Sequence, residues 1–435
     1  MTFIDLPYQR EGADWLASQA RAGLADEQRV GKAVQAIMAC DKVGAQRIAV
    51  VCPAKATHQW RAQFERFGRP LAYRQLRVLS YEEATKVFGA VSVKTSQNLA
   101  DVVILDEAHR LKNPTSQRTT AIYPKLQYVD YVWALTGTPM PNDPSELWTH
   151  FRWLKPHLIP APGKGAPLTY EAFRAAFCEM KRGFGGEPQV VGVKNLDVLK
   201  PLVDKLWLRR MLADVQPQLP KMRYGEIVLK SSKQQDVREV HEISAHLPKE
   251  KYDRLITDPD SLPVGDEELS SLRRLVAEAK AGALADYLRE ELETYPEQKI
   301  VVFAWHTNAL DRLARDLRKF GPVIVDGRTK NPTAAVAAFQ NDPESRVCLG
   351  QIVAAGTALD FTAASDVIFL ELSWTPVENW QAQSRILGID QKAQSCLCRT
   401  VVLKDSIDEA VTRVLARKSR MIEETMNRQA AIDLF

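Results

Sequence analysis

Short apolar runs recur along the chain, and each is followed by a turn and then by a pattern of helical spacing. The runs rich in β-branched residues lie at 47–53, 76–81, 101–109 and 131–139 in the first half, and at 299–305, 322–327, 346–352, 366–372 and 399–403 in the second. Continuous apolar strands that alternate with helices are typical of parallel sheets covered on both faces. The pattern therefore predicts an α/β fold in which a series of parallel strands occurs twice.

The middle of the chain has a different pattern, which predicts helices. Residues 168–180 and 270–293 show helical spacing, and residues 257–268, rich in Asp and Pro, predict an exposed linker. We expect a first domain at 1–222 with a helical insertion at about 150–205. We expect a second domain at 223–435 with an insertion at about 235–290 and a C-terminal helix at 406–430.

Composition places the chain among ordinary globular proteins. It has 435 residues, of which 45% are hydrophobic and 26% charged, and a net charge of +4. This charge is compatible with nucleic acid but does not argue for it unless Lys and Arg gather on one face. The six cysteines form no CxxC pair, so we expect buried thiols in a reducing cytosol rather than zinc or redox chemistry.

Neither a signal peptide nor a membrane span is expected. The N-terminus has no basic segment followed by an apolar one. No apolar run approaches the ~20 residues that cross a bilayer. The sequence therefore predicts a cytoplasmic protein, and its compact organisation suggests a bacterial or phage source.

The first chemically suggestive stretch is LADEQRVGKAVQAI, residues 24–37. Gly31 and Lys32 precede a helical pattern, and a helix start offers backbone N–H groups and a favourable dipole to phosphates, to which Lys adds a charge. Ala33 follows, where such loops usually carry a hydroxyl for a metal. Alone, the pair is weak evidence, because a Gly-Lys pair before a helix is more often a helix cap or a solvated lysine.

Two carboxylates follow a buried strand at VVILDEAHR, residues 102–110. The carboxyl edge of an open α/β sheet is where ligands bind. Asp106 there can hold Mg²⁺, and Glu107 can orient and deprotonate an attacking water, as phosphoryl transfer requires. The alternative is an acidic pair that caps a helix.

Two further stretches suit a nucleotide site. LTGTP, residues 135–139, ends another strand and offers the Thr136 and Thr138 hydroxyls. Tyr8 and Gln9 precede a helix, and a Gln amide can both donate to and accept from adenine. Each could also be a plain turn.

Taken together, these motifs resemble helicase superfamily 2, and within it the Swi/Snf-like DNA translocases. The order YQ, GK, DEAH, LTGTP resembles superfamily 2, and HRLKNPTSQ and LWLRRMLADVQPQLP resemble its Swi/Snf-like members in particular. In the second half, KIVVFAWHTNALDRLARDL resembles motif IV, AAGTALDFTAASDVIFLELSWTP motif V and NWQAQSRILGIDQ motif VI. VKNLDVLKPLVDKLWLRR is most similar to the compact annealing-helicase and phage-type branch.

The resemblance implies two RecA-like lobes with ATP in the cleft between them. It implies that Lys32 holds phosphates, Asp106 serves Mg²⁺, Glu107 is the catalytic base and Arg385 acts from the second lobe. The implied ATP-binding residues are Tyr8, Gln9, Arg10, Val30, Gly31, Lys32, Ala33, Thr136, Gly356, Asp360, Gln381 and Arg385.

The resemblance also implies double-stranded DNA as the partner, bound through its backbone without sequence specificity. The implied contacts are Pro53, Lys55, Ser80, Tyr81, Lys112, Asn113, Trp305, His306 and Thr357. Trp305 and His306 could equally be core and surface residues at a strand end.

The chain departs from the family pattern at three places. Arg29 stands where the loop usually has its first glycine, and Ala33 replaces a threonine. In motif VI, Arg385 is present, but Leu387 replaces a histidine and Gly388 the second arginine, the finger that reaches the γ-phosphate. Loss of such a finger typically costs ~10³–10⁵ in rate.

Two functions are therefore open. The chain could be an ATP-dependent translocase with weakened hydrolysis, or a degenerate helicase that binds DNA or assists assembly without turnover. A protein that recruits it is possible, and a nuclease-coupled motor is disfavoured because no acidic cluster with a partner lysine lies outside the helicase motifs.

Overall fold

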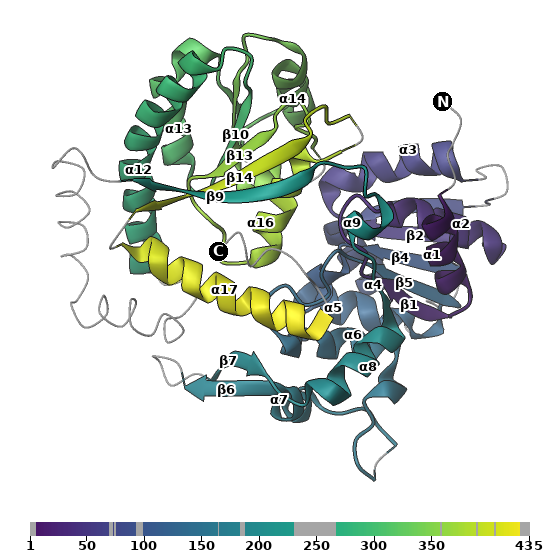
Figure 1. The fold of residues 1–435 in the computed structure, drawn as a ribbon. Helices are drawn as coiled ribbons and strands as arrows, with labels where there is room; N and C mark the ends of the chain where they lie inside the picture. Colours follow the sequence, from purple (N-terminus) through teal and green to yellow (C-terminus); the bar gives the residue numbers. More distant parts are fainter. Residues whose placement is uncertain are drawn as a thin grey trace. The chain divides into compact units, whose positions relative to one another are not determined.

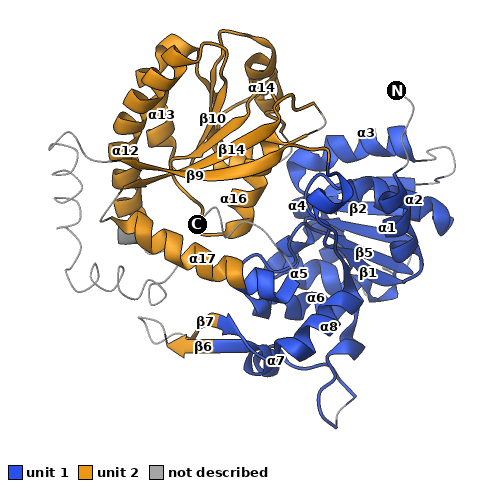
Figure 2. Cartoon of the chain, viewed as in Figure 1, with its two compact units in different colours: residues 1–179, 192–217, 421–428 blue, residues 180–191, 218–420, 429–435 orange. Residues whose placement is uncertain are grey.

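The computed structural model describes residues 6–68, 73, 75–92, 99–163, 165–182, 188–229, 267–356, 359–388, 390–403 and 406–426. The chain divides into two compact units (Figure 2). The first comprises residues 1–179, 192–217 and 421–428, and the second comprises residues 180–191, 218–420 and 429–435.

The first unit is built on a six-stranded parallel sheet in the order β3-β2-β4-β5-β1-β8 (Figure 1). Its strands are β1 (Arg21–Leu24), β2 (Arg47–Cys52), β3 (Gln75–Ser80), β4 (Val102–Asp106), β5 (Tyr131–Leu135) and β8 (Trp207–Leu208). All neighbours run parallel, so the carboxyl ends of β1, β5 and β4 meet at one edge of the sheet.

Helices of this unit are α1 (Pro7–Ala17), α2 (Lys32–Lys42), α3 (Thr57–Phe67), α4 (Tyr81–Ala90), α5 (Gln117–Ile122), α6 (Leu147–Leu154), α7 (Tyr170–Phe177), α8 (Leu196–Leu206) and α9 (Leu212–Val215). Leu16 of α1, Ile37 of α2 and Phe64 of α3 are buried in one cluster with alternate strand residues such as Val50 and Trp133. The intervening strand residues are buried as well, so both faces of the sheet are covered, as continuous apolar strands require.

The second unit contains another six-stranded parallel sheet, in the order β11-β12-β10-β13-β14-β9. Its strands are β9 (Lys221–Leu229), β10 (Ile300–Ala304), β11 (Val323–Val325), β12 (Val347–Gln351), β13 (Asp366–Phe369) and β14 (Ser395–Leu403). Its helices are α12 (Glu267–Thr294), α13 (Thr307–Asp316), α14 (Pro332–Asn341), α15 (Ile352–Ala355) and α16 (Pro376–Gln383). It also contains α17 (Ile407–Met426) up to Arg420, and the rest of that helix is assigned to the first unit. Side chains of α12 and α13, among them Leu284 and Leu310, are buried against Val302 and Ile368 of the sheet.

The predicted fold class is confirmed, because two parallel α/β sheets occur in series. The helical expectation for the middle is correct for α6, α7, α8 and α12 but wrong at β6 (Cys178–Arg182) and β7 (Pro188–Val193), which form a two-stranded sheet. Four of the five residues of β6 are exposed, so this strand lacks the apolar pattern that would mark it. Most of the predicted linker at 257–268, and residues 427–430 of the predicted C-terminal helix, lie outside the described residues.

The six cysteines are buried free thiols, as expected. Among the described residues, no group of His, Cys, Asp and Glu side chains is arranged to hold a metal by itself. Helices that combine the length and the hydropathy of a membrane span are also absent from the described parts of the chain.

Candidate nucleotide and catalytic site

The candidate phosphate cradle is the loop that joins β1 to α2. Gly31 has φ +80° and directly precedes Lys32, the first residue of α2. The first amides of a helix have no partner inside it, and within the described residues no side chain caps α2. The helix start therefore presents N–H groups and positive dipole where a phosphate group would fit.

The Lys32 side chain is held by backbone carbonyl groups of this loop. Its Nζ donates to the carbonyl oxygens of Asp26 (2.8 Å) and Glu27 (3.0 Å). Burial lowers the pKa of Lys32, and the nearby carboxylates of Glu107, Asp26 and Asp106 oppose that shift. The ammonium thus lies within electrostatic reach of both residues of the acidic pair.

Gln9 lies against the cradle. It is buried near the start of α1, which begins with Pro7 at a position where proline's fixed φ is favourable. A Cβ at Gly31 would overlap the Gln9 amide nitrogen. Glycine therefore suits the left-handed backbone at this position, and a larger residue would also displace the Gln9 amide. Tyr8 is also buried, whereas Arg10 is exposed.

The backbone at Arg29 is left-handed, at the position where the family pattern has a glycine. Arg29 adopts φ +65°, a conformation that favours glycine. Ala33 packs its methyl group against the apolar core of the unit, so no hydroxyl reaches the cradle from this position.

The acidic pair lies at the carboxyl end of β4, as predicted. Asp106 Oδ1 accepts from the Glu107 N–H (3.0 Å), and Oδ2 accepts from the Trp60 indole N–H (2.7 Å). Burial, reinforced by the charge of Glu107, raises the pKa of Asp106 to about 6. A carboxylate held this way is costly to ionise without a cation beside it, which suits a metal ligand.

Glu107 is positioned by its backbone and by a histidine. Its φ is +51°, a strained value for a residue with a side chain, and such strain is concentrated at functional sites. Glu107 Oε2 lies 3.3 Å from His109 Nδ1, which in turn lies 3.0 Å from the Thr136 hydroxyl.

Thr136 therefore belongs to the same edge, directly after β5. β4 and β5 pair with Asp106 opposite Leu135. A Cβ at Gly137 would lie 4.0 Å from Lys32 Nζ. The structure thus brings Gln9, Gly31, Lys32, Asp106, Glu107 and Thr136 together at one sheet edge of the first unit.

In the second unit, motifs V and VI meet. Arg385 Nε donates to the Gly356 carbonyl (3.0 Å), and the Phe361 N–H donates to the Arg385 carbonyl (2.9 Å). Gln381 is buried on α16, and Gly388 is buried at the end of motif VI. Asp360 directly precedes Phe361, and Thr357 lies outside the described residues.

Comparisons with known proteins agree with this arrangement of motifs. Residues 78–252 match the family model of the SNF2-related domain, and residues 282–388 match that of the helicase conserved C-terminal domain. The chain belongs to the SNF2-related, Swi/Snf-like branch of superfamily 2.

Individual relatives align along almost the whole chain. It is 29% identical to the Caenorhabditis elegans homolog of SWI/SNF-related matrix-associated actin-dependent regulator of chromatin subfamily A-like protein 1, over 95% of this chain and 60% of that protein. It is 28% identical to the Bos taurus DNA annealing helicase and endonuclease ZRANB3, over 97% of this chain and 40% of that protein. The chain thus spans about half the length of these relatives.

A solved structure, the Sulfolobus solfataricus SWI2/SNF2 ATPase core in complex with dsDNA, aligns with 98% of both chains. The sequence identity is 17% and the TM-score is 0.42.

Candidate DNA contacts of the SNF2-related chain differ in their exposure. Pro53 and Lys55 follow β2, and Lys55 is exposed, as is Asn113. Lys112 is paired with Glu146 at 2.5 Å. These positions remain proposals for DNA contact.

Ser80 and Tyr81 have roles inside the first unit. Ser80 caps α4 in a capping box with Glu83. Tyr81 is fully buried, and its hydroxyl donates to the carbonyl oxygens of Asp106 (2.8 Å) and Glu107 (3.4 Å). The Tyr81 hydroxyl thus supports the acidic pair from inside the unit. Contact of Ser80 and Tyr81 with DNA stays a proposal.

Trp305 and His306 follow β10 in the second unit. Both N–H groups donate to Glu371 Oε2 (3.0 and 2.9 Å), and His306 Nδ1 lies 2.8 Å from Glu371 Oε1. Burial raises the pKa of Glu371, but the hydrogen bond and charge of His306 outweigh burial and hold this pKa below its ordinary value. Glu371 therefore fixes the backbone and the ring at this proposed DNA contact.

Sequence reasoning missed Trp60, Asp26, Arg210 and Glu371. Glu371 follows a buried strand, which is the signal that revealed Asp106. Trp60 and Arg210 act on partners 46 and 184 residues away, and no local pattern marks such a pair.

Proposed function

We propose that the chain is an ATP-dependent translocase on double-stranded DNA in which hydrolysis is weakened. The observation that carries this proposal is the electrostatic cluster of Lys32, Asp106 and Glu107 at the end of a parallel sheet. A phosphate-binding ammonium beside a metal-binding carboxylate and a base is what phosphoryl transfer to water requires.

The residues of the cradle fit a nucleotide with Mg²⁺. Gly31 leaves room beside Gln9, and Lys32 heads an uncapped helix. In this proposal Lys32 holds the β- and γ-phosphates, Gln9 recognises adenine, and Asp106 holds Mg²⁺. Bound Mg²⁺ would neutralise the charge of the phosphate oxygens.

Glu107 is the proposed general base. Its left-handed backbone and its approach to His109 limit the orientations of the carboxylate. It can then orient a water and take its proton during attack on the γ-phosphate. The contact from His109 to Thr136 joins this base to the end of the next strand.

Two residues support weakened turnover. Ala33 supplies no hydroxyl for the metal, although Mg²⁺ ordinarily keeps several waters that can fill such a position. Gly388 supplies no arginine finger, whose loss costs about 10³–10⁵ in rate. Arg385 is the remaining arginine of motif VI, beside Gly356.

The proposed partner is the DNA backbone. Lys55, Asn113 and the Trp305–His306 segment are the side-chain candidates. Contacts with phosphates carry no sequence information and release counterions. Binding should therefore weaken steeply as the salt concentration rises and should not depend on sequence.

A second candidate function is a non-hydrolysing DNA-binding or assembly subunit. Ala33 and Gly388 favour this function, because ATP hydrolysis would lack both the hydroxyl that binds the metal and the arginine finger. The intact Lys32, Asp106 and Glu107 favour hydrolysis.

Phosphate release with and without duplex DNA tests the proposal. We expect DNA-stimulated release that Glu107→Gln abolishes and that Glu171→Gln, the same change at an exposed site on α7, leaves intact. Release that is absent in the wild type under all conditions would overturn the enzymatic proposal in favour of the subunit. A large gain with Gly388→Arg would indicate that the loss of the finger limits the rate.

A further inference from the structure

A segment far from the cradle in sequence, residues 207–216, runs along it in the first unit. β8 pairs with β1 (Gly23 opposite Trp207). Beyond the strand, the Ala25 N–H donates to the Leu208 carbonyl (2.7 Å), and the Glu27 N–H donates to the Arg210 carbonyl (2.9 Å). The backbone of this segment therefore extends the sheet alongside the loop that leads to Lys32.

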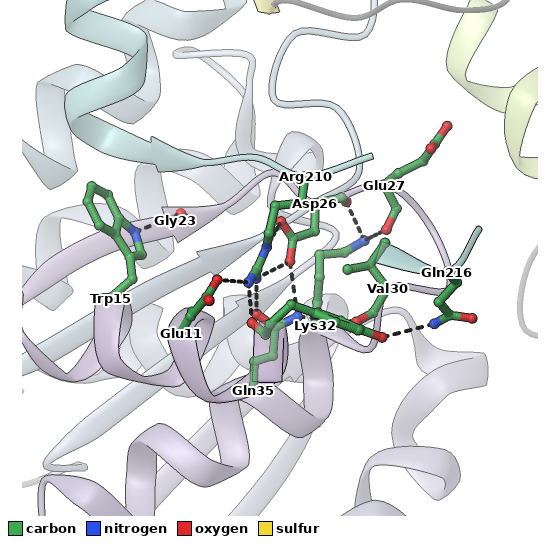
Figure 3. A network of polar contacts seen from close by, with 11 residues as sticks. Glu11, Trp15, Gly23, Asp26, Glu27, Val30, Lys32, Gln35, Arg210 and Gln216 are labelled. Atoms are coloured by element: carbon green, nitrogen blue, oxygen red, sulfur yellow. Dashed lines mark hydrogen bonds and ion pairs between the residues drawn. The ribbon is translucent and has the colours of Figure 1, made fainter. Parts of the chain in front are cut away.

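The Arg210 side chain reaches across this loop (Figure 3). Nε and Nη2 donate to Asp26 Oδ1 (3.2 Å) and Oδ2 (2.6 Å), and Nη2 also donates to Gln35 Oε1 (2.5 Å). Nη1 donates to the Tyr8 carbonyl. The Asp26 side chain is fully buried and that of Arg210 is 13% exposed, so this is a charge pair whose members depend on each other.

Gln35 closes the network. Its Nε2 donates to Asp26 Oδ2 (3.0 Å) and to the Val30 carbonyl (3.2 Å). The network therefore connects α1, the cradle loop, α2 and the 207–216 segment. It holds the loop at Asp26 and at Val30, on both sides of the left-handed Arg29.

Two more contacts attach the segment to the same elements. The Leu212 N–H donates to Glu27 Oε2 (2.8 Å), and Gln216 Nε2 donates to the Tyr8 hydroxyl (2.9 Å). Space for the network is reserved on α1, because a Cβ at Gly12 would overlap both Gln35 Oε1 and Arg210 Nη2.

We propose that Arg210 is a positioning residue for nucleotide binding, acting through Asp26 and Gln35 on the cradle. The carbonyl of Asp26 holds Lys32 Nζ, and the carbonyl of Tyr8 precedes Gln9. The Arg210 guanidinium thus fixes the backbone that positions Lys32, which would bind the phosphates, and Gln9, which would bind adenine. This inference rests on the proposed nucleotide site.

Arg210→Lys tests the proposal because it keeps the charge and removes the fork that grips Asp26 and Gln35. The matched control is Arg399→Lys in the second unit. Arg399 is likewise a buried arginine that bridges two carboxylates, Asp366 and Glu291. Both variants are expected to lose thermal stability, so stability alone does not separate them.

The measurement is the Kd of the full chain for a fluorescent methylanthraniloyl-ATP with Mg²⁺. We expect Arg210→Lys to raise this Kd about ten-fold, the effect of losing one charge-assisted hydrogen bond. Arg399→Lys should leave it at the wild-type value. An unchanged Kd in Arg210→Lys, or an equal rise in both variants, would overturn the proposal.

A second pair keeps the test decisive if Arg210→Lys folds poorly. Gly12→Ala, which displaces Gln35 and Arg210, should raise the Kd, whereas Gly89→Ala, another helical glycine with no atom nearer than 4.0 Å to its Cβ, should not. Equal Kd values for these two variants would overturn the proposal. If the wild type binds no nucleotide, the proposed function fails and this inference fails with it. Wild-type binding that neither Arg210→Lys nor Gly12→Ala changes would overturn the inference alone.

Discussion

Gly31→Ala separates the two reasons for a glycine at the end of the cradle. The backbone there has φ +80°, and an alanine held in this region costs about 1–2 kcal/mol. Removing glycine also restricts the unfolded chain, which offsets about 0.4–1 kcal/mol. The net expected loss in the free energy of unfolding is about 1 kcal/mol.

Gly44→Ala provides the matched control. Gly44 has φ +63°, and a Cβ there would meet no atom within 4 Å. The two variants should therefore lose similar stability in a urea titration. Gly31→Ala additionally pushes aside the Gln9 amide.

The difference should appear in nucleotide binding. We expect Gly31→Ala to weaken ATP binding and to reduce the preference for ATP over GTP, because the displaced Gln9 no longer presents its amide to the base. Gly44→Ala should bind like the wild type. If Gly31→Ala kept both the affinity and the preference, the placement of Gln9 in the site would be refuted.

Three further predictions concern the same edge of the sheet. Trp60→Phe removes the indole N–H that donates to Asp106 Oδ2 at 2.7 Å. The Mg²⁺ concentration needed for ATP binding should therefore rise about ten-fold. An unchanged Mg²⁺ titration would show that Trp60 does not support metal binding by Asp106. Burial and Glu107 raise the pKa of Asp106 from 3.8 to about 6, so the folded metal-free protein takes up this proton as the pH falls through 6. Affinity for Mg²⁺ measured between pH 8 and 5 should therefore drop below pH 6. Asp106→Asn, which lacks the carboxylate, should bind Mg²⁺ weakly throughout this range. Arg29→Gly relieves a left-handed arginine. It should raise the free energy of unfolding by up to about 1 kcal/mol, seen as a higher urea midpoint. A lower midpoint would show that the arginine's contacts outweigh the strain.

Much of the fold was predictable because its strands are buried on both faces. β4 and β10 read as continuous apolar runs, and their burial patterns explain why. β1 was missed because its four residues, RAGL, include only one large apolar side chain. β9 was missed because it is an edge strand with Lys, Arg, Gly and Glu at exposed positions.

Prediction of the candidate site was limited by sequence distance. Lys32, Asp106, Glu107 and Thr136 each follow a recognisable local pattern, and the order of parallel strands brings them to one edge. The side chains that hold them come from elsewhere. Trp60 on α3 and Arg210 beyond β8 look like ordinary core and surface residues in the sequence, and only the fold shows their partners.

Tyr81 has a structural role that its motif did not indicate. The motif directed attention to DNA, yet the side chain is buried and donates to the backbone of Asp106 and Glu107. The capping box of Ser80 and Glu83 fixes the start of α4 and thus the position of this tyrosine. A change at Tyr81 would therefore act on the acidic pair from inside the unit.

Displacement of a triplex-forming strand from duplex DNA tests the central claim most directly, because it requires movement along the duplex and not strand separation. With ATP and Mg²⁺, the wild type should release the third strand, slowly but well above the rate with a non-hydrolysable analogue. Glu107→Gln should bind the same DNA and release none. Release by the wild type that was equal with and without hydrolysable ATP, or none at protein concentrations that saturate the DNA, would contradict the account.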